Sequence, residues 1–322
     1  ADGVGQTRKA REGIPMHERT QRAIARLMFV FCCAVPTALT MTCVLVTWTP
    51  WYHNRALRTL QATLSRDTGL IVQIDDFERV APSTIHLHSV RVLEPETLME
   101  VAHVRRLDWV SGSEQTSILL HQPELQSSQL ASTWQMIHDR FLCRPEQTSV
   151  PIEVAGSDLT IHSRTGSLSV RDVLAWIQPR EDAVEATVPC MLASSKSNAP
   201  VEIRVRRDRS GEDPVTDWAL HANGSPLPCS ALAEYLPLMA SVGSDAEFSG
   251  TMSWQLGQNH WWVDLGGSSF KQVSLDRLFE QHAHRLSGTA EIQFKRCHVE
   301  PHNRISDIVG SIHAADGMIG RS

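Results

Sequence analysis

Histidines, carboxylates and serines are the side chains here that could bind a metal or carry out acid–base and nucleophilic chemistry. His86-Leu-His88 would place two imidazoles on one face of a strand, a spacing that some zinc sites use. Such a site needs a third ligand from a neighbouring strand, whereas an exposed polar strand face explains the same pattern without a metal. His282-Ala-His284 lies in a helical pattern, where residues two apart point in different directions. We therefore expect no metal site and no cofactor.

The carboxylates and serines lack the context of a catalytic centre. Asp75-Asp76 and the Glu94/Glu96 pair could form acid–base pairs, but they fall in turn-like surroundings typical of solvated loops. Ser249-Gly250 and Ser287-Gly288 are more simply explained as the starts of strands. The sequence contains no P-loop, dinucleotide fingerprint, nucleophile elbow or H-E-x-x-H motif. We assign no catalytic residue and expect a protein that is not an enzyme; an anchored hydrolase is a third, weaker hypothesis.

The cysteines divide between an apolar segment and the rest of the chain. Outside the segment they are Cys143, Cys190, Cys229 and Cys297. Their spacing matches no metal motif, and an oxidising compartment would allow two disulfides in three connectivities. We expect buried free thiols, with disulfides as the alternative.

The stretch from Leu27 to Trp48 contains no charged residue over 22 positions, and a helix of about 20 apolar residues crosses a bilayer. Pro36 lies inside it, and membrane helices tolerate such a kink. Trp48, Trp51 and Tyr52 lie at its far end, as expected at a membrane interface. A buried helix of a soluble domain is the alternative. The membrane-anchor residues are Leu27, Phe29, Val30, Phe31, Val35, Leu39, Val44, Leu45, Val46 and Trp48.

The flanking charges predict the orientation of this anchor. Arg8, Lys9, Arg11, Arg19, Arg22 and Arg26 precede it, whereas only Arg55, Arg58 and Arg66 follow within twenty residues. The positive-inside rule then places residues 1–26 in the cytoplasm as a tail, disordered over 1–22, and the bulk of the chain outside. No small-residue cleavage site follows the apolar run, so we expect an uncleaved anchor at 27–48.

The exterior part, residues 54–322, is predicted to be mainly β with short helices (α+β). Residues 54–67 form an amphipathic helix, and short strands follow. The sequence 200–207 alternates most regularly, with Val201, Ile203 and Val205 on one face and charged residues on the other. The alternation over 84–92 slips near Ser89, as a bulge would cause. A net charge of −6 gives no indication of nucleic-acid binding.

Two stretches repeat a pattern, because Glu247–Trp254 and Arg285–Ile292 share Ser-Gly-Thr 38 residues apart. A repeated unit of strands and a helix indicates an extended array. The anchor, Ala56-Leu-Arg-Thr-Leu60, Gly69–Ile74 and the stretch from Ile85 to Thr97 occur in an order that resembles AsmA-like proteins. These belong to the repeating β-groove, bridge-like lipid-transfer proteins. Gly224–Pro228, Phe248-Ser-Gly250, Leu286-Ser-Gly288, Gly310 and Asp316–Gly320 resemble the same family.

This resemblance implies a fold and a function. The fold would be an inner-membrane anchor followed by an elongated, curled antiparallel β-sheet groove in the periplasm. The function would be to bind or conduct phospholipid-like molecules in envelope and outer-membrane biogenesis, with lipid acyl chains as partners. Family members are commonly longer, so we expect a groove domain shortened at its C-terminus. The candidate groove residues are Val201, Ile203, Val205, Met252, Trp254, Val263 and Leu265.

The alternative function is a structural or docking module that binds an envelope assembly partner and fills its apolar face with its own helices. An open apolar channel favours lipid binding, and a closed one favours docking. Trp254, Trp261 and Trp262 suit either a groove wall or a core, and we expect core.

Overall fold

The structure is a computed structural model that divides into two compact units, residues 1–58 and 59–322, which are described separately. It describes residues 18–321 except 130–133, 135–137, 144–148, 165, 196, 212, 234–237, 258–259, 281–283 and 302–303. Most of the predicted cytoplasmic tail, residues 1–17, therefore lies outside the described part, as does His282.

The first unit contains a continuous apolar helix, Thr20–Thr47, that is long enough to cross a membrane. It consists of α1 (Glu18–Phe29), a π-helical turn η1 (Val30–Ala34) and α2 (Val35–Thr47). Pro36 explains the π turn, because proline lacks an N–H and its ring collides with the carbonyl four residues earlier. The N–H of Val35 accordingly donates to the carbonyl of Val30, one residue further back than in an α-helix. The membrane-anchor side chains that we predicted are exposed, as a lipid-facing helix requires.

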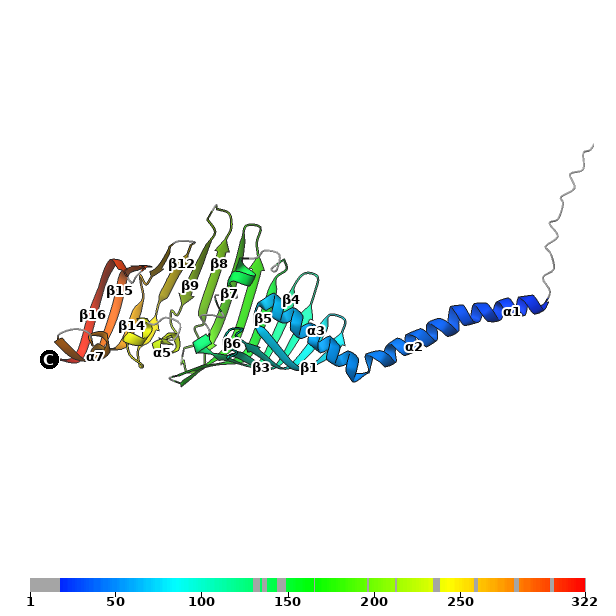
Figure 1. The fold of residues 1–322 in the computed structure, drawn as a ribbon. Helices are drawn as coiled ribbons and strands as arrows, with labels where there is room; N and C mark the ends of the chain where they lie inside the picture. Colours follow the sequence, from blue (N-terminus) through cyan, green and yellow to red (C-terminus); the bar gives the residue numbers. More distant parts are fainter. Residues whose placement is uncertain are drawn as a thin grey trace, which may run out of the picture. The chain divides into compact units, whose positions relative to one another are not determined.

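The second unit is a long β-sheet, which Figure 1 shows as a row of strands. Among the described residues sixteen strands form one sheet. The strands are β1 (Ile71–Ala81), β2 (Thr84–Leu93), β3 (Glu100–Ser111), β4 (Thr116–Gln126), β5 (Ile152–Ser163), β6 (Gly166–Pro179), β7 (Ala183–Leu192), β8 (Val201–Asp208), β9 (Val215–His221), β10 (Leu227–Pro228), β11 (Glu247–Ser249), β12 (Thr251–Leu256), β13 (Trp261–Asp264), β14 (Ser269–Ser274), β15 (His284–Glu300) and β16 (Arg304–Arg321). The prediction of a mainly β exterior is confirmed.

Neighbouring strands are mostly consecutive in sequence and antiparallel, but β4 and β5 pair in parallel. The prediction of a wholly antiparallel sheet is therefore wrong at this pair. A parallel pair needs a crossover rather than a hairpin, and the long connection between β4 and β5 provides one. It contains η2 (Ser127–Gln129) and η3 (His138–Leu142). The sheet is open and uncurled, so the predicted curl along its length is not found in the described residues.

One face of this sheet is apolar from β6 to β15. Cross-strand partners on it form an unbroken row of Ile177, Ala186, Val205, Trp218, Trp254, Val263 and Val299. In β8 the buried Val201 and Val205 alternate with the charged residues, which confirms the alternation predicted there. Because side chains alternate along a strand, this register keeps the apolar set on one side.

A line of left-handed residues crosses the first six strands. Ser89 in β2, Gln122 in β4 and Asp172 in β6 have φ values of 52°, 50° and 52°. Leu87 and Val90 on either side of Ser89 are both buried although they are three residues apart. The register between β1 and β2 is unchanged across this point, so the alternation slips without an inserted residue. The slip predicted near Ser89 is confirmed; its cause is a left-handed residue rather than an inserted one.

Short segments cover the apolar face near its middle and far end. They include α5 (Cys229–Leu232), α6 (Leu238–Ser241), α7 (Leu275–Leu278) and the strands β10 and β11. Phe248 and Cys229 have no exposed surface and pack in one cluster with Val201, Leu220 and Met252 from the sheet. Gly250, from the first Ser-Gly-Thr, has φ +123°, and a Cβ there would lie 2.6 Å from Ser268 Cα, so the repeat requires glycine at this position.

Candidate functional site

An apolar cavity of about 550 Å³ lies between the end of α3 (Pro50–Thr68) and the first five strands. The cavity volume is within the range of roughly 300–1,000 Å³ usual for small-molecule sites. Apolar side chains from every one of the five strands line it, and α3 contributes one side. The lining residues are Leu64, Asp67, Thr68, Val72, Leu87, Val90, Val92, Leu107, Trp109, Thr116, Ile118, Val150 and Ile152.

Two side chains of α3 position the helix on the edge of β1. Gln61 Nε2 donates to the carbonyl of Ile74 at 2.9 Å, and the N–H of Val72 donates to Ser65 Oγ at 2.9 Å. Edge groups of a sheet need partners, and these bonds supply them. The helix is therefore held at the edge, and the cavity forms between its last turns and the sheet.

Trp109 is the aromatic residue of the lining. Its indole Nε1 is buried and has no hydrogen-bond partner among the described residues. An unpaired buried donor costs about 1–3 kcal/mol. The lining is mostly apolar, so the site suits a mostly apolar ligand.

The seven candidate groove residues lie further along the sheet, in or beside the row of apolar cross-strand partners. Val201, Val205, Met252 and Leu265 are buried, and Ile203, Trp254 and Val263 are partly buried. The chain itself covers much of this region, because Leu142 from η3 packs with Val184, Val205 and Trp218. The structure thus places these residues on one face of the sheet. Other segments of the chain cover that face.

The tryptophans at this point form a packed stack. Trp254 lies parallel to Trp218 with ring centroids 4.9 Å apart, and Trp134 meets Trp218 edge-on at 3.8 Å. Trp262 faces the opposite side, where its Nε1 donates to Gln255 at 3.2 Å. Trp254 therefore packs against the core, as expected from the sequence, whereas Trp262, for which core was also expected, lines the polar hollow.

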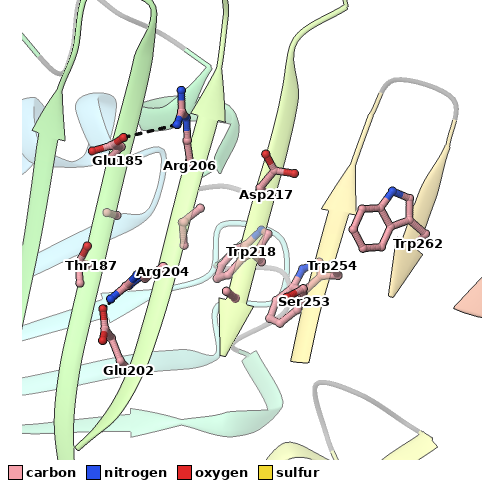
Figure 2. A pocket seen from close by; sticks show the side chains of 13 residues that line it. Glu185, Thr187, Glu202, Arg204, Arg206, Asp217, Trp218, Ser253, Trp254 and Trp262 are labelled. Atoms are coloured by element: carbon pink, nitrogen blue, oxygen red, sulfur yellow. Dashed lines mark hydrogen bonds and ion pairs between the residues drawn. The ribbon is translucent and has the colours of Figure 1, made fainter. Parts of the chain in front are cut away.

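The polar face carries a second hollow, of about 500 Å³, across β7 to β13 (Figure 2). Its charged side chains pair with one another: Arg204 with Glu202, and Arg206 with Glu185 at 4.0 Å. Asp217 accepts a hydrogen bond from Gln255 at 2.6 Å. Because these charges are already compensated, the hollow offers a ligand little beyond a solvated surface.

His86 joins a cluster on the polar face of β2 to β4. Its Nε2 lies 3.7 Å from Asp108, which also pairs with Arg106 at 2.7 Å and His121 at 2.8 Å. Burial alone would raise the pKa of Asp108, but hydrogen bonds from His121 and Arg106 and the charges of Arg106 and His86 outweigh it and lower that pKa. The sequence showed His86, but not that Asp108 would lie opposite it.

Sequence reasoning missed one group that could hold a metal. His138, Asp139 and Cys143 bring three ligand atoms within 4.8 Å of one another. Burial raises the pKa of the Cys143 thiol although the charges of Arg207 and Arg209 lower it. Those two guanidinium groups disfavour a cation at this place.

The four exterior cysteines are free thiols, as expected, but only Cys229 and Cys297 are buried; Cys190 is partly buried and Cys143 is exposed, contrary to the expectation. Burial raises the pKa of Cys190 to about 11, and that of Cys229 to about 12 with a contribution from Glu247. Thiols with such high pKa values form little of the reactive thiolate at neutral pH.

No family model, curated protein or solved structure matches the chain. The apolar cavity beneath α3 is therefore the candidate site on geometric and chemical grounds.

Proposed function

We propose that this chain is a single-pass membrane-anchored protein that binds the acyl chains of phospholipid-like molecules on the apolar face of its sheet. The observation that carries the proposal is the apolar cavity under α3. Burying acyl methylene groups there yields about 25 cal/mol for each Å² removed from water. The headgroup stays in water.

The groove in this proposal is local, formed by α3 and β1 to β5. The left-handed residues Ser89, Gln122 and Asp172 give these strands a line at which they can bend, as bulges do in other sheets. The resemblance to AsmA-like proteins supports the same proposal. It adds that the anchor lies in the inner membrane with the N-terminus in the cytoplasm, and that the lipid serves envelope or outer-membrane biogenesis.

Two neighbouring residues of β4 provide the test. Ile118 lines the cavity, whereas Leu119 is 41% exposed. The full chain and the variants Ile118→Arg and Leu119→Arg would be purified in one detergent, and bound phospholipid per chain measured by mass spectrometry. We expect Ile118→Arg to lose binding by about tenfold or more, which corresponds to about 1.4 kcal/mol. All three proteins carry the same membrane helix, so lipid bound to that helix contributes equally to each measurement.

Circular dichroism separates loss of the site from loss of the fold. If the folded Ile118→Arg and Leu119→Arg variants carry equal lipid, the cavity is not the binding site and the proposal fails.

The second candidate, a docking module, is favoured by a separate observation. The chain's own segments cover the apolar face over β7 to β12, as a closed structural sheet would require. A well-folded full chain that takes up no phospholipid from vesicles beyond the amount bound by the Ile118→Arg variant would favour this function.

A further inference from the structure

A third hollow, of about 460 Å³, lies on the polar face of β2 to β5, and we call it the basic hollow. All of its lining side chains are polar or charged: His88, Arg105, Arg106, His121, Gln122, Ser157 and Asp158. It opens on the opposite face of the sheet from the apolar cavity, because Leu107 lines the cavity and its neighbour Arg106 lines the hollow. The basic hollow is therefore separate from the proposed acyl-chain site.

Three strands each contribute two consecutive residues to the basic hollow. The pairs are Arg105-Arg106 in β3, His121-Gln122 in β4 and Ser157-Asp158 in β5. In a regular strand consecutive side chains point to opposite faces, so only one residue of each pair would line the hollow. The slip in alternation along the line of left-handed residues, which includes Gln122 with φ 50°, accounts for the second. The slip thus concentrates hydrogen-bonding groups at one place on the polar face.

The basic hollow keeps a positive charge available to a ligand. Four of its seven lining residues are basic, and one, Asp158, is acidic. Arg105 has no ion pair among the described residues, and its Nη1 donates to the neutral Oε1 of Gln122 at 3.1 Å. In the hollow across β7 to β13, by contrast, Arg204 and Arg206 each pair with a glutamate. The two hollows therefore differ in whether their arginines are compensated.

A carboxylate beneath the basic hollow holds two of its bases in position. The side chain of Asp108 is 17% exposed, and it accepts from Arg106 Nε at 2.7 Å and lies 2.8 Å from His121 Nε2. A guanidinium group has five N–H donors, so Arg106 keeps donors for a ligand after this pairing. The bases are thus oriented before any ligand arrives.

We propose that the basic hollow binds a phosphate group, with Arg105 as its principal contact. The N–H groups of a guanidinium form a rigid fork that matches the oxygens of a phosphate in geometry and in charge. Arg106, His88 and His121 surround the same space and add further N–H donors. Asp158 repels an anion and so limits the affinity. The phosphate belongs either to a soluble phosphate ester or to a lipid headgroup, and the test separates these two sources.

Calorimetric titration of the full chain in a non-ionic detergent measures the binding. One probe is soluble glycerol 3-phosphate, and the other is detergent micelles that contain phosphatidic acid. We expect Arg105→Gln to weaken phosphate binding by about tenfold, because a charge-assisted hydrogen bond is lost. Arg204→Gln is the matched control, because it removes the same charge from an arginine that is 61% exposed and paired with Glu202. This control should bind like the unmodified chain.

A second variant is expected to change the affinity in the opposite direction. Asp158→Asn removes the acidic residue of the lining and should tighten binding by about threefold, because an anion no longer faces a like charge. Loss of folding cannot produce this gain. Ile118→Arg, which alters the apolar cavity, should leave glycerol 3-phosphate binding unchanged, so this proposal and the proposed acyl-chain site fail independently.

The two probes give distinguishable outcomes. If Arg105→Gln weakens binding of both probes, the hollow recognises the phosphate group from either source. If only the micelle probe binds and responds, the phosphate is that of a lipid headgroup. The proposal is overturned if neither probe binds saturably, if Arg204→Gln weakens binding as much as Arg105→Gln, or if Asp158→Asn weakens it.

Discussion

Asp108 is the residue whose surroundings make the clearest prediction. Because its folded-state pKa lies below the ordinary value of 3.8, its ion pairs stabilise the fold above that pH and lose this effect as the pH falls through the lowered pKa. We expect Asp108→Asn to reduce the free energy of unfolding by about 1 kcal/mol at pH 7. Denaturant unfolding at several pH values should show the difference shrinking below pH 3.8. A constant difference down to pH 2 would contradict this account.

At the scale of single residues, the sequence identified candidate side chains but not their neighbours in space. His86 was visible as half of a histidine pair, yet its partner Asp108 lies on another strand and depends on the register between β2 and β3. Trp109 likewise gained its role from the strands beside it. Cross-strand partners follow from pairing, which local patterns do not contain.

Ser89 shows how a single backbone angle affects an element. A non-glycine residue in the left-handed region costs about 1–2 kcal/mol, and β-branched residues tolerate it least. We expect Ser89→Gly to raise the free energy of unfolding by up to about 1 kcal/mol and Ser89→Val to lower it. Urea unfolding of both variants measures this. If valine is tolerated as well as glycine, Ser89 does not hold this conformation in solution.

The apolar helix makes a prediction about membrane insertion. Val35 and Leu39 are exposed, at 46% and 62%, near the middle of the predicted anchor. An arginine at the centre of a membrane helix costs about 2.5–3.5 kcal/mol. We expect the double variant V35R/L39R to leave the membrane fraction upon alkaline carbonate extraction, whereas V35I/L39I stays. Equal retention of both variants would show that this helix is not the anchor.

The elements with a strong pattern of apolar residues were the part of the fold that the sequence predicted. The helix from Thr20 to Thr47 and the alternation of β8 follow directly from the residue types. The parallel β4–β5 pair did not, because the crossover between them has weak periodicity. The left-handed residues Gln122 and Asp172 were not predicted either, since neither is a glycine.

At the scale of the whole molecule, the predicted groove residues and the apolar cavity lie in different parts of the sheet. Val201, Val205 and Met252 lie on the apolar face, but packing of the chain's own inserts buries them. The open apolar volume lies instead under α3, because a helix held at the edge of β1 by Gln61 and Ser65 leaves space above the strands. Inserts that fold back onto a sheet depend on long-range contacts, which alternation along one strand cannot indicate.

The central claim is that an acyl chain occupies the cavity under α3. The most direct measurement uses the full chain in vesicles containing a phospholipid with a photoreactive diazirine on its acyl chain, followed by mapping of the adducts by mass spectrometry. We expect adducts on peptides carrying Leu87, Leu107 or Ile118, in addition to those on the membrane helix. Adducts confined to residues 27–48 would contradict the account, because they would leave the cavity without lipid.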